Sequence, residues 1–119
     1  MTDILKNWIA AYKAAWTSND PADIRALFTD DAIYKHNPFD AEPWRGIDEI
    51  LDGWLKSPDD PSEWTFEGVP LFYADGVGAI EGETRYSDGS VYANLWILRF
   101  GDDGRVNDFT EWWMQPKKD

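Results

Sequence analysis

The hydrophobic periodicity of the chain changes near Trp64, and this change restricts the possible folds more than any other feature. Before Trp64, apolar residues recur at the spacing of helical faces, most clearly over residues 3–18. After it, strand-like segments alternate with turn signals, of which Asp75-Gly76 is typical of a two-residue hairpin. Helices followed by consecutive strands predict an α+β domain whose helices pack on one face of an antiparallel sheet.

Three helices and one strand are predicted in the first half. The first helix covers residues 3–18, and a second follows Asp20-Pro21, since an N-cap aspartate before a proline is a common helix start. Its inward residues are Ile24, Leu27 and Phe28. Residues 31–37 form a strand that ends at Pro38, and a third helix starts near Gly46.

Four strands are predicted in the second half, over residues 63–74, 77–86, 90–100 and 105–115. Three of them are long, so we expect a strongly curved sheet in which Gly78 and Gly82 allow bends. Such a sheet with helices across its open end makes a cone that encloses a pocket. A length of 119 residues fits a single domain, residues 1–119.

Composition excludes several classes of function. The chain has 11 Lys and Arg against 23 Asp and Glu, a net charge of −12, which disfavours nucleic acid and membrane surfaces as partners. With no cysteine and one histidine, we expect no metal site, disulfide or thiol nucleophile. No nucleotide-binding or serine-hydrolase motif occurs, so no cofactor is expected. The start, MTDILKNW, lacks the features of a signal peptide, which predicts a cytoplasmic location.

Three segments together resemble a known family: AYKAAWTSNDPADIRALFTDDAIYKHNPF, EPWRGIDEILDGW and WILRFGDDGRVNDFTEWW. Their order and spacing are similar to the nuclear transport factor 2-like superfamily, in its ketosteroid-isomerase and polyketide-cyclase (SnoaL-like) branch. The likeness covers nearly the whole chain and implies a cone-shaped α+β roll. It implies less about chemistry, because this superfamily includes isomerases, hydrolases, cyclases, dehydratases and binding proteins.

The resemblance also assigns positions one by one. Tyr12 matches the tyrosine that donates to the oxyanion in bacterial ketosteroid isomerases. Their general-base aspartate is matched by Asn37, and their second donor, a protonated aspartate, is matched by Trp96. Trp113 matches an aromatic residue of their closing strand. Because an amide is not a base near neutral pH, steroid isomerisation by that mechanism is not expected.

Glu111 is one candidate acid or base. Period-2 alternation places it on the strand face that carries Phe109 and Trp113. A carboxylate among aromatic walls should have a raised pKa, which suits proton transfer near neutral pH. The alternative is an ion pair with Arg99 or Arg85.

His36, the only histidine, is a second candidate, because its ordinary pKa of about 6.5 suits proton transfer. Adjacent strand residues face opposite sides, so if Asn37 faces the pocket, His36 is a rim or surface residue. Tyr12 is either a pocket residue or part of the core. Glu81 and Glu83 share one strand face. Two carboxylates so placed can form an acid–base pair, but a solvated strand edge is the simpler interpretation.

Eight tryptophans in 119 residues suit the wall of a pocket that is apolar and still orients a ligand, although any single one can simply fill the core. Tyr12, Asn37 and Glu111 are the expected polar groups of this pocket. Its expected walls are Trp16, Tyr34, Trp54, Trp96 and Trp113.

Two classes of function follow. The first is a binding protein for a small, largely apolar, aromatic or polycyclic molecule. The second is an isomerase, cyclase or dehydratase that uses Glu111 or His36 for proton transfer. A protein-interaction module is a third class, but the sequence shows no feature specific to a protein partner. Because the last two strands carry apolar residues on both faces, a homodimer is expected.

Overall fold

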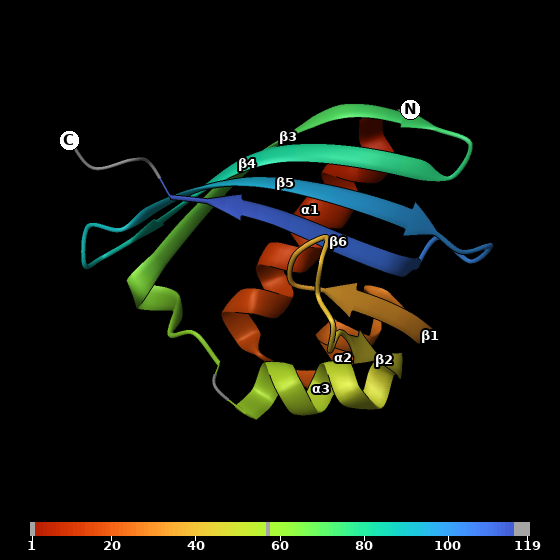
Figure 1. Cartoon of the computed structure of the whole chain (residues 1–119), viewed down its shortest axis with the longest axis horizontal. Coiled ribbons are helices and arrows are strands. Elements are labelled where there is room, and N and C mark those ends of the chain that lie inside the picture. The colour runs from red at the N-terminus through yellow and green to blue at the C-terminus, as the bar shows by residue number, and fades with distance from the viewer. Residues whose placement is uncertain (1, 57, 116–119) are drawn as a thin grey trace.

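A computed structural model describes residues 2–56 and 58–115 (Figure 1). The helices α1, α2 and α3 lie beside a curved, open sheet of six strands, which confirms the predicted α+β class. The elements in chain order are α1 (Thr2–Ser18), α2 (Pro21–Arg25), β1 (Phe28–Lys35), β2 (Trp44–Arg45), α3 (Gly46–Lys56), a 3-10 turn η1 (Pro61–Glu63), β3 (Trp64–Ala74), β4 (Val77–Tyr86), β5 (Val91–Phe100) and β6 (Val106–Met114).

The helices begin close to the predicted positions. The Asp20 carboxylate accepts a hydrogen bond from the backbone N–H of Ala22, with Pro21 in the first turn of α2, as the sequence predicted. The second helix is shorter than expected, because Phe28 already pairs with Val106 of β6 and starts strand β1. The first strand therefore covers residues 28–35 and not 31–37.

The strands have the order β2-β1-β6-β5-β4-β3. Neighbouring strands are antiparallel, as predicted, except that β1 and β6 are parallel. That pairing joins the two halves of the chain and lets α3 pack under β1 (Figure 1). Strand β2 was not predicted, since a two-residue strand is too short to show periodicity.

The β3–β4 hairpin turns at Asp75 and Gly76, as predicted. Both residues have positive φ, 52° and 79°, which tight hairpin turns require. Gly82, expected to bend β4, also provides room: a Cβ built there would lie 2.5 Å from the ring of Phe66. Gly78 provides similar room where α1 passes, since its Cβ would lie 2.5 Å from Leu5.

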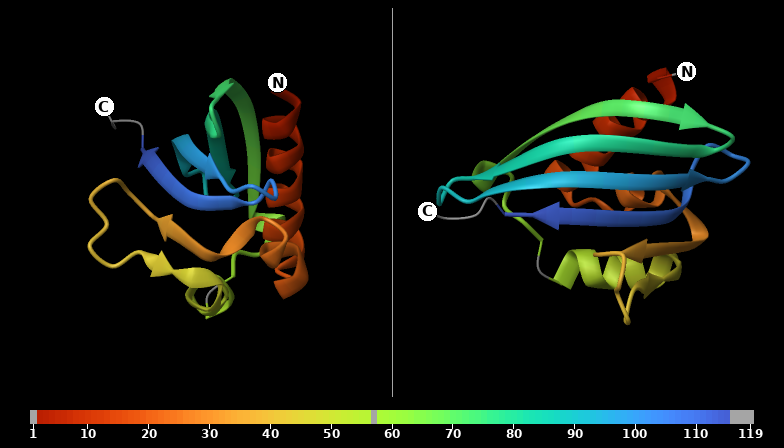
Figure 2. Two further views of the ribbon diagram at one scale, coloured as in Figure 1. Left: turned by 90° about the vertical axis from the view of Figure 1, so that its right-hand side faces the viewer. Right: turned by 45° about the horizontal axis from the view of Figure 1, so that its top comes forward.

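The two faces of the long strands have different surroundings. The inner face packs against α1, and Leu5, Trp8 and Ile80 are among the buried residues there. The outer face of β3–β6 carries exposed apolar side chains, including Phe72, Trp112 and Met114, and the described helices lie on the other side (Figure 2). Within residues 2–56 and 58–115, no helix is both long and apolar enough to cross a membrane.

Candidate functional site

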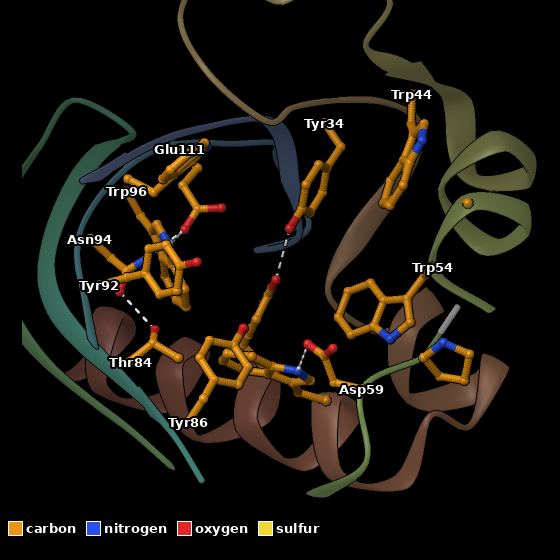
Figure 3. A pocket seen from close by; sticks show the side chains of 15 residues that line it. Tyr34, Trp44, Trp54, Asp59, Thr84, Tyr86, Tyr92, Asn94, Trp96 and Glu111 are labelled. Carbon is orange, nitrogen blue, oxygen red and sulfur yellow. Dashed lines mark hydrogen bonds between the residues drawn. The ribbon is translucent and has the colours of Figure 1, made fainter. Parts of the chain in front are cut away.

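A cavity of about 390 Å³ lies between the inner face of the sheet, the second half of α1, and α3 (Figure 3). Most of its lining residues are aromatic: Tyr12, Trp16, Tyr34, Trp44, Trp54, Tyr86, Tyr92, Trp96 and Trp113. The others are Gly53, Pro58, Asp59, Thr84, Asn94 and Glu111. Periodicity explains the convergence, because inward positions of α1 meet inward positions of β4, β5 and β6.

Tyr12 and Tyr34 form a hydroxyl pair in the cavity. Their oxygens are 2.8 Å apart, and both side chains are buried. Burial raises the pKa of each phenol well above its usual range, so both stay neutral near physiological pH. Since one hydroxyl donates to the other, the pair keeps one O–H to donate to a ligand.

Glu111 is an inward carboxylate of β6. One oxygen, Oε2, accepts hydrogen bonds from Asn94 Nδ2 at 2.7 Å and from Trp96 Nε1 at 3.2 Å. The other oxygen, for which no hydrogen-bond partner occurs within the described part of the chain, points into the cavity (Figure 3). Burial raises the pKa of Glu111, and the hydrogen bonds from Trp96 and Asn94 oppose that rise.

Thr84 fixes the orientation of the Asn94 amide. The Thr84 hydroxyl donates to Asn94 Oδ1 at 2.7 Å, and both side chains are buried. With its oxygen occupied, Asn94 turns its NH₂ group toward Glu111. Three neighbouring strands, β4, β5 and β6, therefore position a single carboxylate oxygen.

The aromatic mouth, which we define as Tyr86, Tyr92 and Trp113, borders the open side of the cavity. Tyr92 meets Tyr86 edge to face at 5.7 Å and Trp113 edge to face at 5.7 Å. Trp113 is 54% exposed, so part of its surface is available to a ligand. Burial raises the pKa of Tyr86 to about 12, which keeps it neutral.

Asp59 stands at the opposite wall. Its carboxylate accepts a hydrogen bond from Trp16 Nε1 at 3.1 Å, and Trp16 stacks on Trp64 with ring centroids 3.8 Å apart. Asp59 itself is exposed. The cavity thus has one carboxylate inside and one at its edge.

The structure brings most of the predicted site residues together around this cavity. Their predicted roles in binding or catalysis stay predictions. The residues that line it are Tyr12, Trp16, Tyr34, Trp54, Trp96, Glu111 and Trp113. Glu111 has no ion pair within the described residues, and Arg85, one of its two expected partners, pairs with Glu83 instead.

His36 and Asn37 do not line the cavity. The sequence expectation relied on strand alternation, but β1 ends at Lys35, so alternation does not reach these positions. His36 Nδ1 lies 2.9 Å from the Asp40 carboxylate, whose pKa is lowered to about 2 by hydrogen bonds from the His36 backbone and ring. Asn37 is exposed, and its side chain accepts from the Phe39 backbone N–H.

Sequence reasoning missed eight of the lining residues. Tyr92 and Asn94 share the inward face of β5 with Trp96, so strand alternation could have predicted them. Thr84 and Tyr86 join the site only through the register between β4 and β5, which no local pattern fixes. The other four carry no local signal: Trp44, Gly53, Pro58 and Asp59. Among the described residues, no cluster of three or more His, Cys, Asp or Glu is arranged to hold a metal ion.

Comparison with solved structures finds the same fold in several proteins. A nuclear transport factor 2-like protein of unknown function from Mesorhizobium loti is 16% identical, with a TM-score of 0.72 over 95% of this chain and 93% of its own. One from Cytophaga hutchinsonii is 17% identical, with a TM-score of 0.72 over 96% and 99%. An LEH-like epoxide hydrolase from M. tuberculosis is 16% identical, with a TM-score of 0.66 over 91% and 80%.

None of the curated proteins matches the sequence. The family model described as "SnoaL-like domain" matches residues 9–109, which include nearly all elements from α1 to β6. The neighbours of similar structure agree with this match at the level of the fold. The chain therefore belongs to the SnoaL-like domain family, and its fold is that of the nuclear transport factor 2-like proteins it resembles.

Proposed function

We propose that this protein binds a small, largely apolar, aromatic or polycyclic molecule in the cavity. The observation that carries this proposal is the aromatic lining, contributed by α1, α3, β1, β2, β4, β5 and β6. Flat rings offer large contact areas to a flat ligand at a small cost in conformational entropy. A volume of about 390 Å³ lies within the range of small-molecule sites.

A few polar groups would orient the ligand. The Tyr12–Tyr34 pair offers one hydroxyl donor, and the inward Glu111 oxygen offers an acceptor. Asn94 and Trp96 each donate one N–H to the other Glu111 oxygen and so hold the carboxylate in place. Few, well-placed polar groups in an apolar wall are typical of ligand sites.

A second candidate function is a cofactor-independent isomerase, cyclase or dehydratase of a small hydrophobic substrate. Glu111 favours it, because a carboxylate with a raised pKa and one inward oxygen can take or give a proton. Tyr12 would donate to a developing oxyanion. His36 lies outside the lining, so this candidate function rests on Glu111. In such an enzyme, Glu111→Gln should lower the rate by roughly 10²–10⁴ while binding persists.

We also propose that two copies associate through the outer face of β3–β6. Exposed Phe72, Trp112 and Met114 support this, since a large apolar patch is a liability on a monomer. A cytoplasmic location stays a prediction, which the absence of cysteine supports.

A titration with 2-naphthol, a neutral two-ring probe, tests the binding function. Trp96 and Trp113 line the cavity, so intrinsic tryptophan fluorescence should change in a saturable way. Trp113→Ala should weaken binding about tenfold, since a lost ring contact is worth on the order of 1 kcal/mol or more. Trp112→Ala is the matched control, because this neighbouring tryptophan faces the outer side of the sheet, and it should leave the affinity unchanged.

The absence of saturation, or an equal loss in both variants, would contradict a site in this cavity. Native mass spectrometry of the purified protein adds an independent test. A small organic molecule that stays bound in the wild type, and is lost in Trp113→Ala but not in Trp112→Ala, is the expected result.

A further inference from the structure

We propose that the ligand of this cavity is an organic cation: an ammonium group, quaternary or protonated, attached to an apolar framework. This inference rests on the proposed binding function and adds the charge of the ligand to it. Three features of the molecule support it: the charges of the lining, the arrangement of the aromatic rings, and the field of the whole chain.

The charged lining residues are all acidic. Glu111 lies inside and Asp59 lies at the edge, and among the described residues no Lys, Arg or His lines the cavity. An anionic ligand would therefore face two carboxylates without a counterion. Closure over a neutral ligand would leave the Glu111 charge desolvated and without an opposite charge, which is costly. A cation would supply the missing charge at the inward oxygen of Glu111.

The hydrogen bonds to Glu111 leave room for this partner. Asn94 and Trp96 both donate to Oε2, and they are neutral donors that do not balance a full charge. The second oxygen points into the cavity (Figure 3). The protein therefore holds the carboxylate in place and leaves one side of it open to a ligand.

The aromatic mouth lines the same cavity as Glu111. Tyr92 stands at 88° to Tyr86 and at 74° to Trp113, so these rings do not form one flat stack. Ring faces carry negative electrostatic potential and attract ammonium groups, and several rings around one cation form an aromatic cage.

The charge of the whole chain acts in the same direction. A net charge of −12 raises the local concentration of cations and repels anions, most strongly where a low-dielectric cleft focuses the field. Glu111 and Asp59 lie in such a cleft. The field alone would attract any cation, whereas the cage and Glu111 select one with an apolar framework.

Two probes of the same shape isolate the charge: phenyltrimethylammonium and tert-butylbenzene, in which carbon replaces the nitrogen. Both are titrated by tryptophan fluorescence at neutral pH and low ionic strength. The wild type should bind the cation about tenfold more tightly or better than its neutral counterpart. Glu111→Gln should lose most of this preference and should still bind tert-butylbenzene within a few-fold, which also shows that the variant keeps its cavity.

Glu81→Gln is the matched control, because it removes one negative charge at an exposed position of β4. It should keep the preference for the cation. An equal loss in both variants would overturn the inference, since the preference would then come from net charge and not from the site. Equal affinity for the two probes in the wild type would also overturn it and would leave the binding function standing. If neither probe binds, both proposals fail.

Discussion

At the scale of single residues, Glu111 shows how neighbours decide what a side chain does. The sequence alone left two alternatives for it, a pocket acid or base and an ion pair with Arg99 or Arg85. In the folded chain its neighbours are Asn94 and Trp96, which donate to one oxygen, and burial raises its pKa. It forms no ion pair within the described residues, and the hydrogen bonds and the nearby charge of His36 only oppose the rise in its pKa, so its ionisation has a cost that a surface glutamate does not have.

This cost makes a prediction about stability and pH. A raised pKa means that the folded state holds the Glu111 proton at pH values where the unfolded state has lost it. Stability from this group is therefore present below the unfolded pKa and is lost as pH rises through the folded pKa. Glu111→Gln lacks this loss. Its free energy of unfolding should therefore increase relative to that of the wild type as pH rises from about 4 to about 7.

Urea unfolding of both proteins across this range is the measurement. Glu81→Gln serves as the control, since it makes the same change of charge at an exposed position. A difference between Glu111→Gln and the wild type that stays constant with pH, or shrinks as pH rises, would show that burial does not penalise the Glu111 charge.

At the scale of elements, β4 shows how a backbone position supports the site from behind. Gly82 leaves space for the ring of Phe66, and Phe66 in turn stacks on Trp96 with centroids 4.6 Å apart and planes 6° apart. Phe66 is 2% exposed and has little freedom to move. Gly82, which does not itself line the cavity, thus supports one wall of the cavity.

Gly82→Ala should therefore destabilise the protein by about 1–3 kcal/mol, the usual cost of overpacking. The new Cβ would lie 2.5 Å from the Phe66 ring, so the ring must shift and take Trp96 with it. Urea unfolding measures the loss, and near-UV circular dichroism should report the changed tryptophan environment. Glu81→Ala, next to it and exposed, should cost no more than about 0.5 kcal/mol. If both substitutions destabilise the protein equally, the loss does not come from the close approach of Gly82 to the Phe66 ring.

At the scale of the whole molecule, the sheet has one face covered by helices and one that is not (Figure 2). The uncovered face carries Ile97 and Leu95 in the middle of β5, beside exposed Trp112. Association through this face would bury it and would leave the cavity, on the inner face, accessible.

Sedimentation equilibrium at micromolar concentration should therefore give twice the 13.7 kDa mass of one chain. Ile97→Glu should shift the protein toward the monomer, because it would place a charge in the middle of an apolar interface. Asp52→Asn, which also changes one charge but lies at an exposed position of α3 outside this face, should leave the mass unchanged. A wild-type protein that sediments only at 13.7 kDa would exclude the homodimer.

Local patterns in the sequence determined the helices, the four long strands, the hairpin at Asp75-Gly76 and the aromatic nature of the site. Each of these depends on residues close together in the chain: helical spacing along α1, alternation along β5 and β6, and turn chemistry. The family resemblance, which also rests on short segments, predicted the cone-shaped roll, and the fold comparisons agree with it. Tyr12, Trp96 and Glu111 could be predicted to converge, because each repeats the inward period of its element.

Tertiary structure alone decided the rest. The parallel pairing of β1 with β6, the end of β1 before His36 and Asn37, and the entry of Thr84, Trp44 and Asp59 into the site all depend on contacts between distant segments. A one-residue change of strand register or length turns a side chain to the other face, and no short pattern fixes that register. The sequence therefore determined which chemical groups are present, and packing determined which of them meet.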